Sequence, residues 1–409
     1  MANTSMFSSF DNWLLRKVYS LSGKPPIRLA LVNGPEVVPS GEALGSIIFR
    51  DRATLLRVTI NPQLNFGEAY SEGAVVVEGE LIAALEAVYQ GMAQGERRSS
   101  FGLASLWLAL RQRNTLRGSR HNIHHHYDLG NDFYRLWLDR NLVYTCAYFP
   151  DPAVSLEEAQ LAKLDHVCRK VRLQPGERVV EAGCGWGALA LHMARNYGVK
   201  VKAFNVSHEQ IVYGRWRARQ EGLDGRVEFI EDDYRNVHGS FDVFVSVGML
   251  EHVGREHYSE LGKIIHQTIG DSGRGLLHFI GRNWKRPLNA WIRKHIFPGG
   301  YPPSLRETME IFEPWDFSVL DVENLRLHYA RTIEHWLERF EQSAHHVASM
   351  FDERFVRMWR LYLAGSAAAF RVGTLQLFQL VFAGSQCQSI PWTRSYLYES
   401  EQQWMQAAE

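Results

Sequence analysis

The stretch VVEAGCGWG, from Val179 to Gly187, decides the fold of this chain. An apolar strand runs into a glycine-rich turn, and the helix-forming segment ALALHMARNYG follows directly. Glycines let a backbone approach a ligand closely, and the start of the next helix offers unpaired N–H groups. The pattern predicts a nucleotide-like ligand at this turn, although tight strand-to-helix connections also use glycines without binding one.

The apolar run that leads into this turn and four further runs after it alternate with helix-forming segments. They read ERVVEAG, VKVKAFNV, RVEFIEDD, FDVFVSVG and RGLLHFIG. This alternation is typical of parallel strands joined by crossover helices, so we expect an α/β domain with a Rossmann-like sheet. After Leu305 the sequence becomes aromatic, and the segments HYARTIEHWLERFEQ and FVRMWRLYLAGSAAAFRVGTLQLFQLVF are predicted to be helical, as a lid over an apolar cavity.

The N-terminal part has a different pattern. From Ile27 to Gly79, the short apolar segments IRLALV, LGSIIF, LLRVTI and GAVVVEG are separated by turn residues, which predicts a small strand-rich unit. A helix is expected from about Glu80 to Ala93, which makes the unit α+β. A polar, basic linker follows. We therefore divide the chain into an N-terminal domain (1–110), a linker (111–124) and a catalytic domain (125–409).

Composition excludes several classes of protein. The 45 basic side chains balance the 45 acidic ones, so no nucleic-acid partner is indicated. The four cysteines lie far apart without a CxxC pair, which disfavours a zinc site or a disulfide framework and fits a reducing cytoplasm. Three consecutive histidines, 124–126, rarely converge on one metal ion. Because no run of about 18 apolar residues occurs, a lipid substrate would have to be reached from the membrane surface.

Later motifs add to the glycine turn. The order E-x-G-x-G-x-G, two acids after the third strand and FDVFVSVGMLEH at the fourth resembles class I S-adenosylmethionine-dependent methyltransferases. The resemblance implies these cosubstrate contacts: Glu181, Gly183, Cys184, Gly185, Gly187, Asp233 and Tyr234. The usual acid at the end of the second strand is missing, so Asn205 or Gln210 would contact the ribose hydroxyls instead.

A closer resemblance, to cyclopropane-fatty-acid and mycolic acid cyclopropane synthases, covers about Asn122 to Phe382. It rests on the blocks HHHYDLGNDFYRLWLD, YTCAYF, EAGCGWGALA, DDYRN, SVGMLEHVG, LLHFIGRN, IFPGGYPPS, HYARTIEHWLERF and AFRVGTLQLFQLVF. Tyr127 matches a motif that closes over the cosubstrate. The first hundred residues resemble the extra domain of full-length bacterial synthases, which implies lipid docking, a homodimer and unsaturated phospholipid acyl chains as substrate.

The implied chemistry needs a base. An alkene attacks the sulfonium methyl group, the resulting carbocation must be kept from water, and ring closure removes a proton from the new methyl group. The family uses bicarbonate for this step, which implies an anion pocket formed by Glu251, His278, Tyr329 and the backbones of Ile280 and Cys146. Taken alone, the first three would be a helix-terminal charge, a core histidine and a packing residue.

Some alternatives stay open. Ser366 stands where many relatives have cysteine, so a fatty acyl methyltransferase giving a methyl- or methylene-branched chain is a second hypothesis. A lipid-binding protein with a degenerate methyltransferase fold is a third. We expect a cytoplasmic protein bound peripherally to the inner membrane, through local basic and aromatic residues that could equally form a charged, solvated loop without a membrane contact. The candidate contact residues are Arg282, Trp284, Lys285, Arg286, Arg293 and Lys294.

Overall fold

A computed structural model describes residues 2–96 and 129–398, which form two compact units. Unit 1 combines the described part of residues 1–112 with 286–298 and 329–375. Unit 2 combines the described parts of 113–285 and 376–409 with 299–328. The predicted C-terminal helices are thus grouped with the N-terminal segment in one unit.

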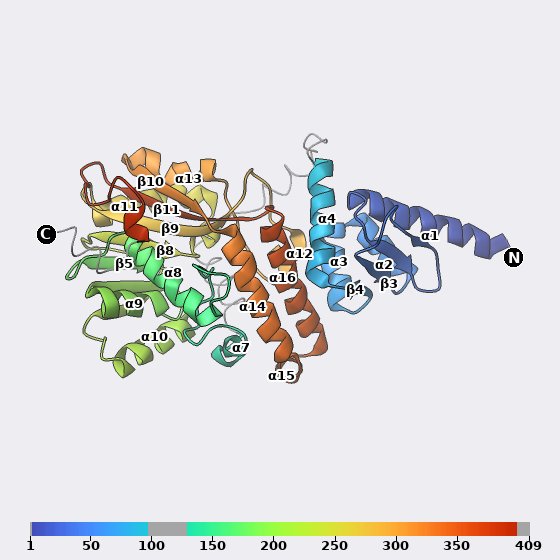
Figure 1. The fold of residues 1–409 in the computed structure, drawn as a ribbon, viewed down its shortest axis with the longest axis horizontal. Coiled ribbons are helices and arrows are strands. Elements are labelled where there is room, and N and C mark those ends of the chain that lie inside the picture. Colours follow the sequence, from blue (N-terminus) through green and yellow to red (C-terminus); the bar gives the residue numbers. More distant parts are fainter. Residues whose placement is uncertain (1, 97–128, 399–409) are drawn as a thin grey trace. The chain divides into compact units, whose positions relative to one another are not determined.

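Unit 2 is built on a seven-stranded sheet with the order β10-β11-β9-β8-β5-β6-β7 (Figure 1). Strands β5 to β9 are parallel, and β10 and β11 extend the sheet in antiparallel fashion. The strands are β5 (Arg178–Ala182), β6 (Lys200–Asn205), β7 (Val227–Glu231), β8 (Val243–Val247), β9 (Arg274–Gly281), β10 (Ser318–Asn324) and β11 (Gln376–Ala383).

Helices cover both faces of this sheet. Successive strand residues point to opposite faces, so Val179 joins an apolar cluster with α8, α9 and α10, while Val180 joins another with α11 and α13. The helices of unit 2 are α7 (Asn131–Arg135), α8 (Leu156–Lys170), α9 (Ala188–Tyr197), α10 (His208–Gln220), α11 (Tyr258–Ile269) and α13 (Leu305–Phe312), with the 3-10 turns η1 (Tyr234–Asn236), η2 (Leu250–His252), η3 (Arg255–His257), η4 (Glu313–Trp315) and η5 (Ser395–Leu397).

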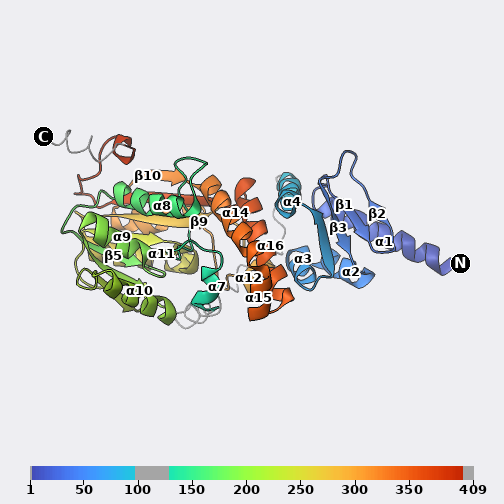
Figure 2. The same cartoon turned by 60° about the horizontal axis from the view of Figure 1, so that its bottom comes forward.

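Unit 1 contains a four-stranded sheet of order β2-β1-β3-β4, packed against α1 and α2 (Figure 2). Further helices of the unit come from distant parts of the chain, and α14 begins in unit 2. The elements are α1 (Ala2–Leu21), β1 (Arg28–Leu31), β2 (Glu36–Val37), β3 (Gly45–Phe49), α2 (Arg52–Ile60), α3 (Pro62–Ser71), β4 (Val75–Gly79), α4 (Leu81–Glu96), α12 (Ala290–His295), α14 (Arg326–Gln342), α15 (Ala344–Met350) and α16 (Glu353–Arg371).

The predicted fold class is confirmed, as a Rossmann-like α/β domain with a small N-terminal α+β region. Two element predictions are wrong. The segment LLRVTI lies in helix α2, because Asp51 caps it by accepting a hydrogen bond from Thr54 N at 2.7 Å and its buried residues follow a helical spacing. The run from Gln376 is strand β11 because Gly373, at φ +76°, follows the end of α16 and every residue of the strand is buried.

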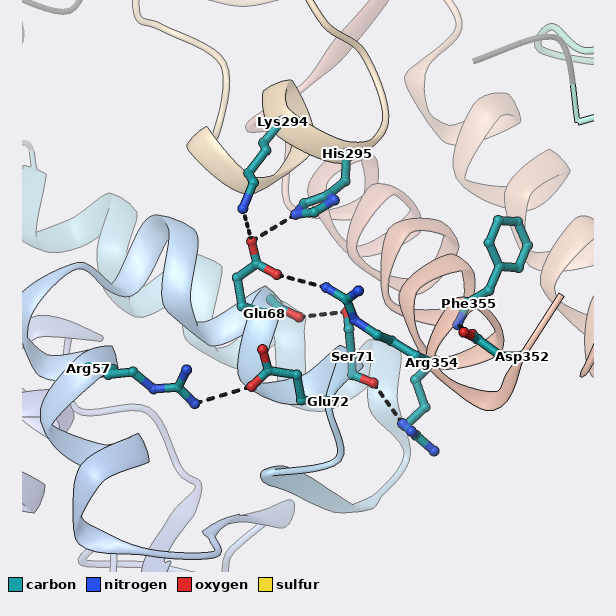
Figure 3. A network of polar contacts seen from close by, with 11 residues as sticks. Arg57, Glu68, Ser71, Glu72, Lys294, His295, Asp352, Arg354 and Phe355 are labelled. Atoms are coloured by element: carbon teal, nitrogen blue, oxygen red, sulfur yellow. Dashed lines mark hydrogen bonds and ion pairs between the residues drawn. The ribbon is translucent and has the colours of Figure 1, made fainter. Parts of the chain in front are cut away.

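Helix α3 is tied to the distant helices of unit 1 by a carboxylate. Glu68 accepts hydrogen bonds from Lys294 Nζ at 2.6 Å and His295 Nε2 at 2.8 Å, both in α12 (Figure 3). Arg354 of α16 contacts its other oxygen at 3.5 Å. Burial alone would raise the pKa of Glu68, but the hydrogen bonds from Lys294 and His295 outweigh it and lower that pKa. The folded state therefore favours the charged form.

Replacing this carboxylate should destabilise the protein in a pH-dependent way. Because the pKa is lower in the folded state, the stabilisation is present above the ordinary value of 4.5 and is lost as the pH falls through the folded value. Urea unfolding of Glu68→Gln should show a loss of stability at about pH 7 that shrinks toward about pH 3. Glu72→Gln is the control, because its exposed pair with Arg57 contributes about 0–1 kcal/mol. An equal loss for Glu68→Gln at both pH values would contradict a charge-based role.

Candidate active site

The order of the strands in unit 2 reverses at β5. From β5 the chain runs outward to β6 and β7, then returns to place β8 on the other side of β5. Ligands in open α/β sheets bind at such a reversal, outside the carboxyl ends of the strands. The glycine turn follows β5, and Gly248 and Met249 follow β8. A methyl group added at Gly183 would lie 3.0 Å from Met249 Cβ, so the two turns are adjacent.

The three predicted glycines of this turn have different roles. All have positive φ, at +84° for Gly183, +53° for Gly185 and +85° for Gly187. A methyl group at Gly187 would lie 2.4 Å from the ring of Phe229, so this glycine is required for packing. At Gly185 no atom of the described residues lies within 4 Å of such a group. Gly185 therefore faces open space, as a ligand-contacting glycine should. The neighbouring Cys184 is buried, which raises the pKa of its thiol well above the ordinary value.

Asn205 and Gln210 lie together beside the glycine turn. Asn205 Nδ2 donates to Gln210 Oε1 at 2.6 Å and to the carbonyl oxygen of Gly185 at 3.3 Å. Gln210 is buried, and its Nε2 has no hydrogen-bond partner among the described residues. The pair thus occupies the place where an acid at the end of the second strand was missing, with one donor left over for a ligand.

The acids after β7 are partly engaged by their neighbours. Asp233 is only 3% exposed, accepts a hydrogen bond from Arg235 N at 3.0 Å and forms an ion pair with the Arg235 side chain at 3.2 Å. Tyr234 is buried, and its hydroxyl has no partner among the described residues. Asp233 therefore caps η1, and its predicted contact with the cosubstrate stays a prediction.

Glu181 ends up deep in the sheet. It is 2% exposed, its Oε2 lacks a partner among the described residues, and burial raises its pKa to about 8. The charge of Lys163 acts in the opposite direction. Burial lowers the pKa of Lys163 to about 8, while its Nζ donates to Thr145 Oγ1 at 2.8 Å. The carboxyl group of Glu181 is thus mostly protonated at neutral pH. Its Oε2 stays without a hydrogen-bond partner among the described residues, beside the glycine turn.

Glu251 of η2 is joined to the end of strand β9. Its Oε1 accepts a hydrogen bond from the backbone N–H of Ile280 at 2.5 Å, and its Oε2 is buried without a partner among the described residues. Burial raises the pKa of Glu251 to about 7 against the opposing hydrogen bond from Ile280. The backbone N–H of Ile280, which was predicted to contact the anion, is thus hydrogen-bonded to Glu251 instead. The atom that lacks a partner among the described residues is Oε2 of Glu251.

His278 lies on the same strand, two residues before Ile280, so both side chains point to the same face. Its Nδ1 pairs with Gln379 Nε2 of β11 at 3.1 Å, and its Nε2 is buried without a partner among the described residues. Burial, together with the charges of Lys163 and Lys170, lowers the pKa of His278 well below its ordinary value. The imidazole is therefore neutral.

The segment around Cys146 lies at the end of β8. A methyl group at Gly248 would be 3.0 Å from Thr145 Cγ2, and Gly248 N donates to the carbonyl oxygen of His278 at 2.8 Å. Cys146 is fully buried, and its Sγ contacts the carbonyl oxygen of Ala147 at 3.1 Å. Unit 2 therefore joins Glu251 directly to Ile280, and it places the turn after β8 against both the segment of Cys146 and the strand that carries His278.

Other predicted residues fall elsewhere. Tyr329 is 8% exposed in unit 1, with its ring 4.7 Å from that of Phe370 and 5.9 Å from that of Trp336. Ser366 lies half-buried in α16 of the same unit. The roles of both in the anion pocket stay predictions. Tyr127 and the linker lie outside the described residues.

The proposed membrane-contact residues differ in their surroundings. Arg282 is 6% exposed, whereas Trp284 is 44% exposed and Lys285 is exposed. Lys294 is paired with Glu68 in unit 1. Among the helices of residues 2–96 and 129–398, none combines the length and hydropathy needed to traverse a bilayer.

Sequence reasoning missed the residues that support the site. Gln379 pairs with His278 across two antiparallel strands, and Lys163 of α8 reaches Thr145. Asn131 accepts a hydrogen bond from Trp186 Nε1 at 2.7 Å, which ties α7 to the glycine turn. Polar residues in apolar runs, such as Gln379 in LQLFQLVF, were the available signal, since buried polar groups require partners.

The sheet order, its reversal at β5 and the glycine turn define a class I S-adenosylmethionine-dependent methyltransferase. Residues 114–380 match the family described as mycolic acid cyclopropane synthetase, and the chain belongs to this family. It is therefore an enzyme of that class, which leaves the degenerate lipid-binding protein without support.

Three known proteins illustrate the similarity. A probable fatty acid methyltransferase of Pseudomonas putida is 35% identical over 393 residues, which are 91% of this chain and 96% of that protein. The cyclopropane-fatty-acyl-phospholipid synthase of Escherichia coli K12 is 44% identical over 260 residues, 63% of this chain and 66% of the relative. The structure of mycolic acid cyclopropane synthase CmaA1 complexed with SAH and CTAB is 30% identical with a TM-score of 0.61, over 64% of this chain and 97% of that one.

A side chain at Gly185 should exclude the cosubstrate. Isothermal titration of Gly185→Val with S-adenosylmethionine should show affinity reduced at least about tenfold, because valine would fill the open space at the turn. Gly222→Val is the matched control, since Gly222 also has positive φ, at +65°, and open space, but lies in the turn between α10 and β7. If both variants bind equally well, or lose affinity equally, ligand exclusion at Gly185 is refuted.

Proposed function

We propose that the enzyme transfers the methyl group of S-adenosylmethionine to a cis double bond of unsaturated phospholipid acyl chains and closes a cyclopropane ring. In the first step the methyl C–S bond breaks, a C–C bond forms and the other alkene carbon becomes a cation. Loss of a proton from the new methyl group then supplies the electron pair for the second C–C bond. The observation that carries this proposal is that two buried atoms, Glu251 Oε2 and His278 Nε2, have no hydrogen-bond partner among the described residues.

Each of these two atoms can form a hydrogen bond of the kind that a small oxyanion uses. Buried polar atoms without partners are costly, and they are expected where a ligand completes their hydrogen bonds. Glu251 and His278 would hold bicarbonate in unit 2, with Tyr329 and the Cys146 backbone as the further members of the predicted set. When bound, the bicarbonate would supply the base for the proton of the delivered methyl group.

The protonation of His278 follows from its partner. Gln379 Nε2 is a donor, so Nδ1 of His278 accepts and the ring proton is on Nε2, the open atom. Because burial keeps the ring neutral, His278 offers one N–H to an anion. Glu251, with its pKa near 7, can offer either a proton or a lone pair at Oε2. The two side chains therefore suit an ion that both accepts and donates hydrogen bonds.

Aromatic residues shield the region next to the glycine turn. Tyr134 and Trp137 are fully buried, and the ring of Tyr134 lies 5.0 Å from Trp186 and 5.5 Å from Tyr144. Aromatic faces stabilise positive charge, and their bulk excludes water. The cluster therefore supports a pathway through a carbocation.

A second candidate function is transfer without ring closure. The Pseudomonas putida relative, similar over nearly the full chain, is named a probable fatty acid methyltransferase, and Ser366 replaces the cysteine expected in α16. In that reaction the cation rearranges and loses a proton from the chain, which leaves a methyl branch, or a methylene branch after a different loss.

The proposal also covers the role of the N-terminal segment, the oligomeric state and the place of the enzyme in the cell. The N-terminal segment would serve lipid docking or dimerisation, and the enzyme would act as a cytoplasmic homodimer bound peripherally to the inner membrane. The support is the substrate itself, because the double bond of a phospholipid is reached only at the bilayer.

Removing one hydrogen-bonding group should slow product formation. For Glu251→Gln we expect a roughly ten- to hundredfold lower rate with little change in cosubstrate affinity, since a hydrogen bond to a charged group contributes about 1.5–3 kcal/mol. Turnover in carbon-dioxide-free buffer should also slow for the wild type. The exposed Glu228→Gln on β7 is the control and should keep the wild-type rate. Full wild-type activity without bicarbonate would contradict the anion model.

The two products can be separated by isotope labelling. With methyl-deuterated cosubstrate and vesicles of cis-unsaturated phospholipid, ring closure must remove one deuterium from the delivered methyl group, whereas a methyl branch keeps all three. A methylene branch also loses one, but its alkene hydrogens are distinguished from upfield cyclopropane hydrogens by proton NMR. We expect loss of one deuterium with ring signals. Full retention, or alkene signals alone, would establish the branched product.

A further inference from the structure

A cationic pocket lies beside the Glu251 site in unit 2. Its volume is about 620 Å³, and its charged lining consists of Arg255, Arg282, Lys285, Arg306, Glu307 and Glu310. Among these described side chains, the cations exceed the carboxylates by four to two. The pocket therefore has the charge to attract an anion.

The carboxylates of the pocket are already engaged. Glu310 is paired with Arg255, and Glu307 completes the capping box of α13 by accepting from Ser304 N at 3.0 Å. Arg255 also lies 3.4 Å from Glu307. By contrast, Lys285 and Arg306 are exposed and form no ion pair with another described residue. These two cations are thus available to a ligand.

The pocket is connected to the proposed reaction site. Arg282 follows Ile280 by two residues, so the wall of the pocket continues strand β9. Tyr301 N donates to the carbonyl oxygen of Glu251 at 2.8 Å, while the Tyr301 hydroxyl donates to Glu307 at 2.7 Å. An anion in the pocket would therefore lie on the same edge of the sheet as the Glu251 carboxyl group.

From this placement we propose that the pocket binds the phosphodiester of the phospholipid whose acyl chain is modified. This inference rests on the proposed function and names a second recognition site for the same substrate. Lysine and arginine are the usual partners of phosphate oxygens. Trp284, 44% exposed at the pocket, is of the type enriched at membrane interfaces, which favours a lipid over a free anion.

Calorimetry with a soluble lipid tests the site apart from the chemistry. Dihexanoyl-phosphatidylglycerol below its micelle concentration should bind the wild type, and Lys285→Glu/Arg306→Glu should weaken that binding at least about tenfold. Lys285→Arg should retain it. Lys263→Glu, a reversal of an exposed charge on α11, is the control and should bind as the wild type does.

Each other outcome overturns the proposal in a distinct way. Unchanged binding by the double variant would show that Lys285 and Arg306 do not bind the lipid. Equal affinity for inorganic phosphate and for the short-chain lipid indicates a free-anion site. A defect seen only with phosphatidylglycerol vesicles, and not with the soluble lipid, indicates general attraction to a charged surface. Because these assays contain no unsaturated chain and no cosubstrate, their failure leaves the cyclopropane proposal to be judged by the labelling experiment alone.

Discussion

The parallel pairing of β5 with β8 is the constraint on which the rest of the site depends. Its register places Glu181 opposite Val245, so both strands end at the same edge of the sheet. The glycine turn and the turn after β8 therefore meet, and the next strand, β9, carries His278 and Ile280 to the same edge. Residues separated by a hundred positions are joined by strand order alone.

This arrangement buries ionisable groups, and burial sets their chemistry. Removing a carboxylate or an ammonium group from water disfavours its charged form. Burial raises the pKa of Glu181 to about 8 and of Glu251 to about 7, while it lowers that of Lys163 to about 8. The interior thus holds groups that are neutral or easily neutralised, with open hydrogen-bonding atoms. Such a site suits a reaction that passes through a cation that water would destroy.

Local signals in the sequence predicted the parts of the fold with strong periodicity. The glycine turn and the parallel strands of unit 2 were placed correctly because each apolar run is bounded by turn residues. The prediction for LLRVTI was wrong because β-branched residues favour strands, whereas the Asp51 cap and the burial pattern determine a helix. Strand β11 was missed because a continuous apolar run has no period that separates a strand from a helix.

The same reasoning explains which parts of the site were predicted. Glu251 and His278 stand in motifs, but Gln379 gains its meaning only from pairing across β9 and β11, which no local pattern encodes.

The antiparallel hairpin of β10 and β11 does more than complete the sheet. Strand β11 supplies Gln379 to His278, and β10 supplies Glu323, which pairs with the buried Lys170 at 2.7 Å and with His166 at 2.8 Å on α8. The ion pair holds α8 against the hairpin, and α8 in turn carries Lys163. Burial and the charges of Lys163 and Lys170 on α8 lower the pKa of His278, whereas Glu323 of the hairpin raises it. The hairpin therefore acts on this ring chiefly through the hydrogen bond of Gln379. The proposed anion site is therefore supported by α8, β10 and β11, through residues that need not contact a substrate.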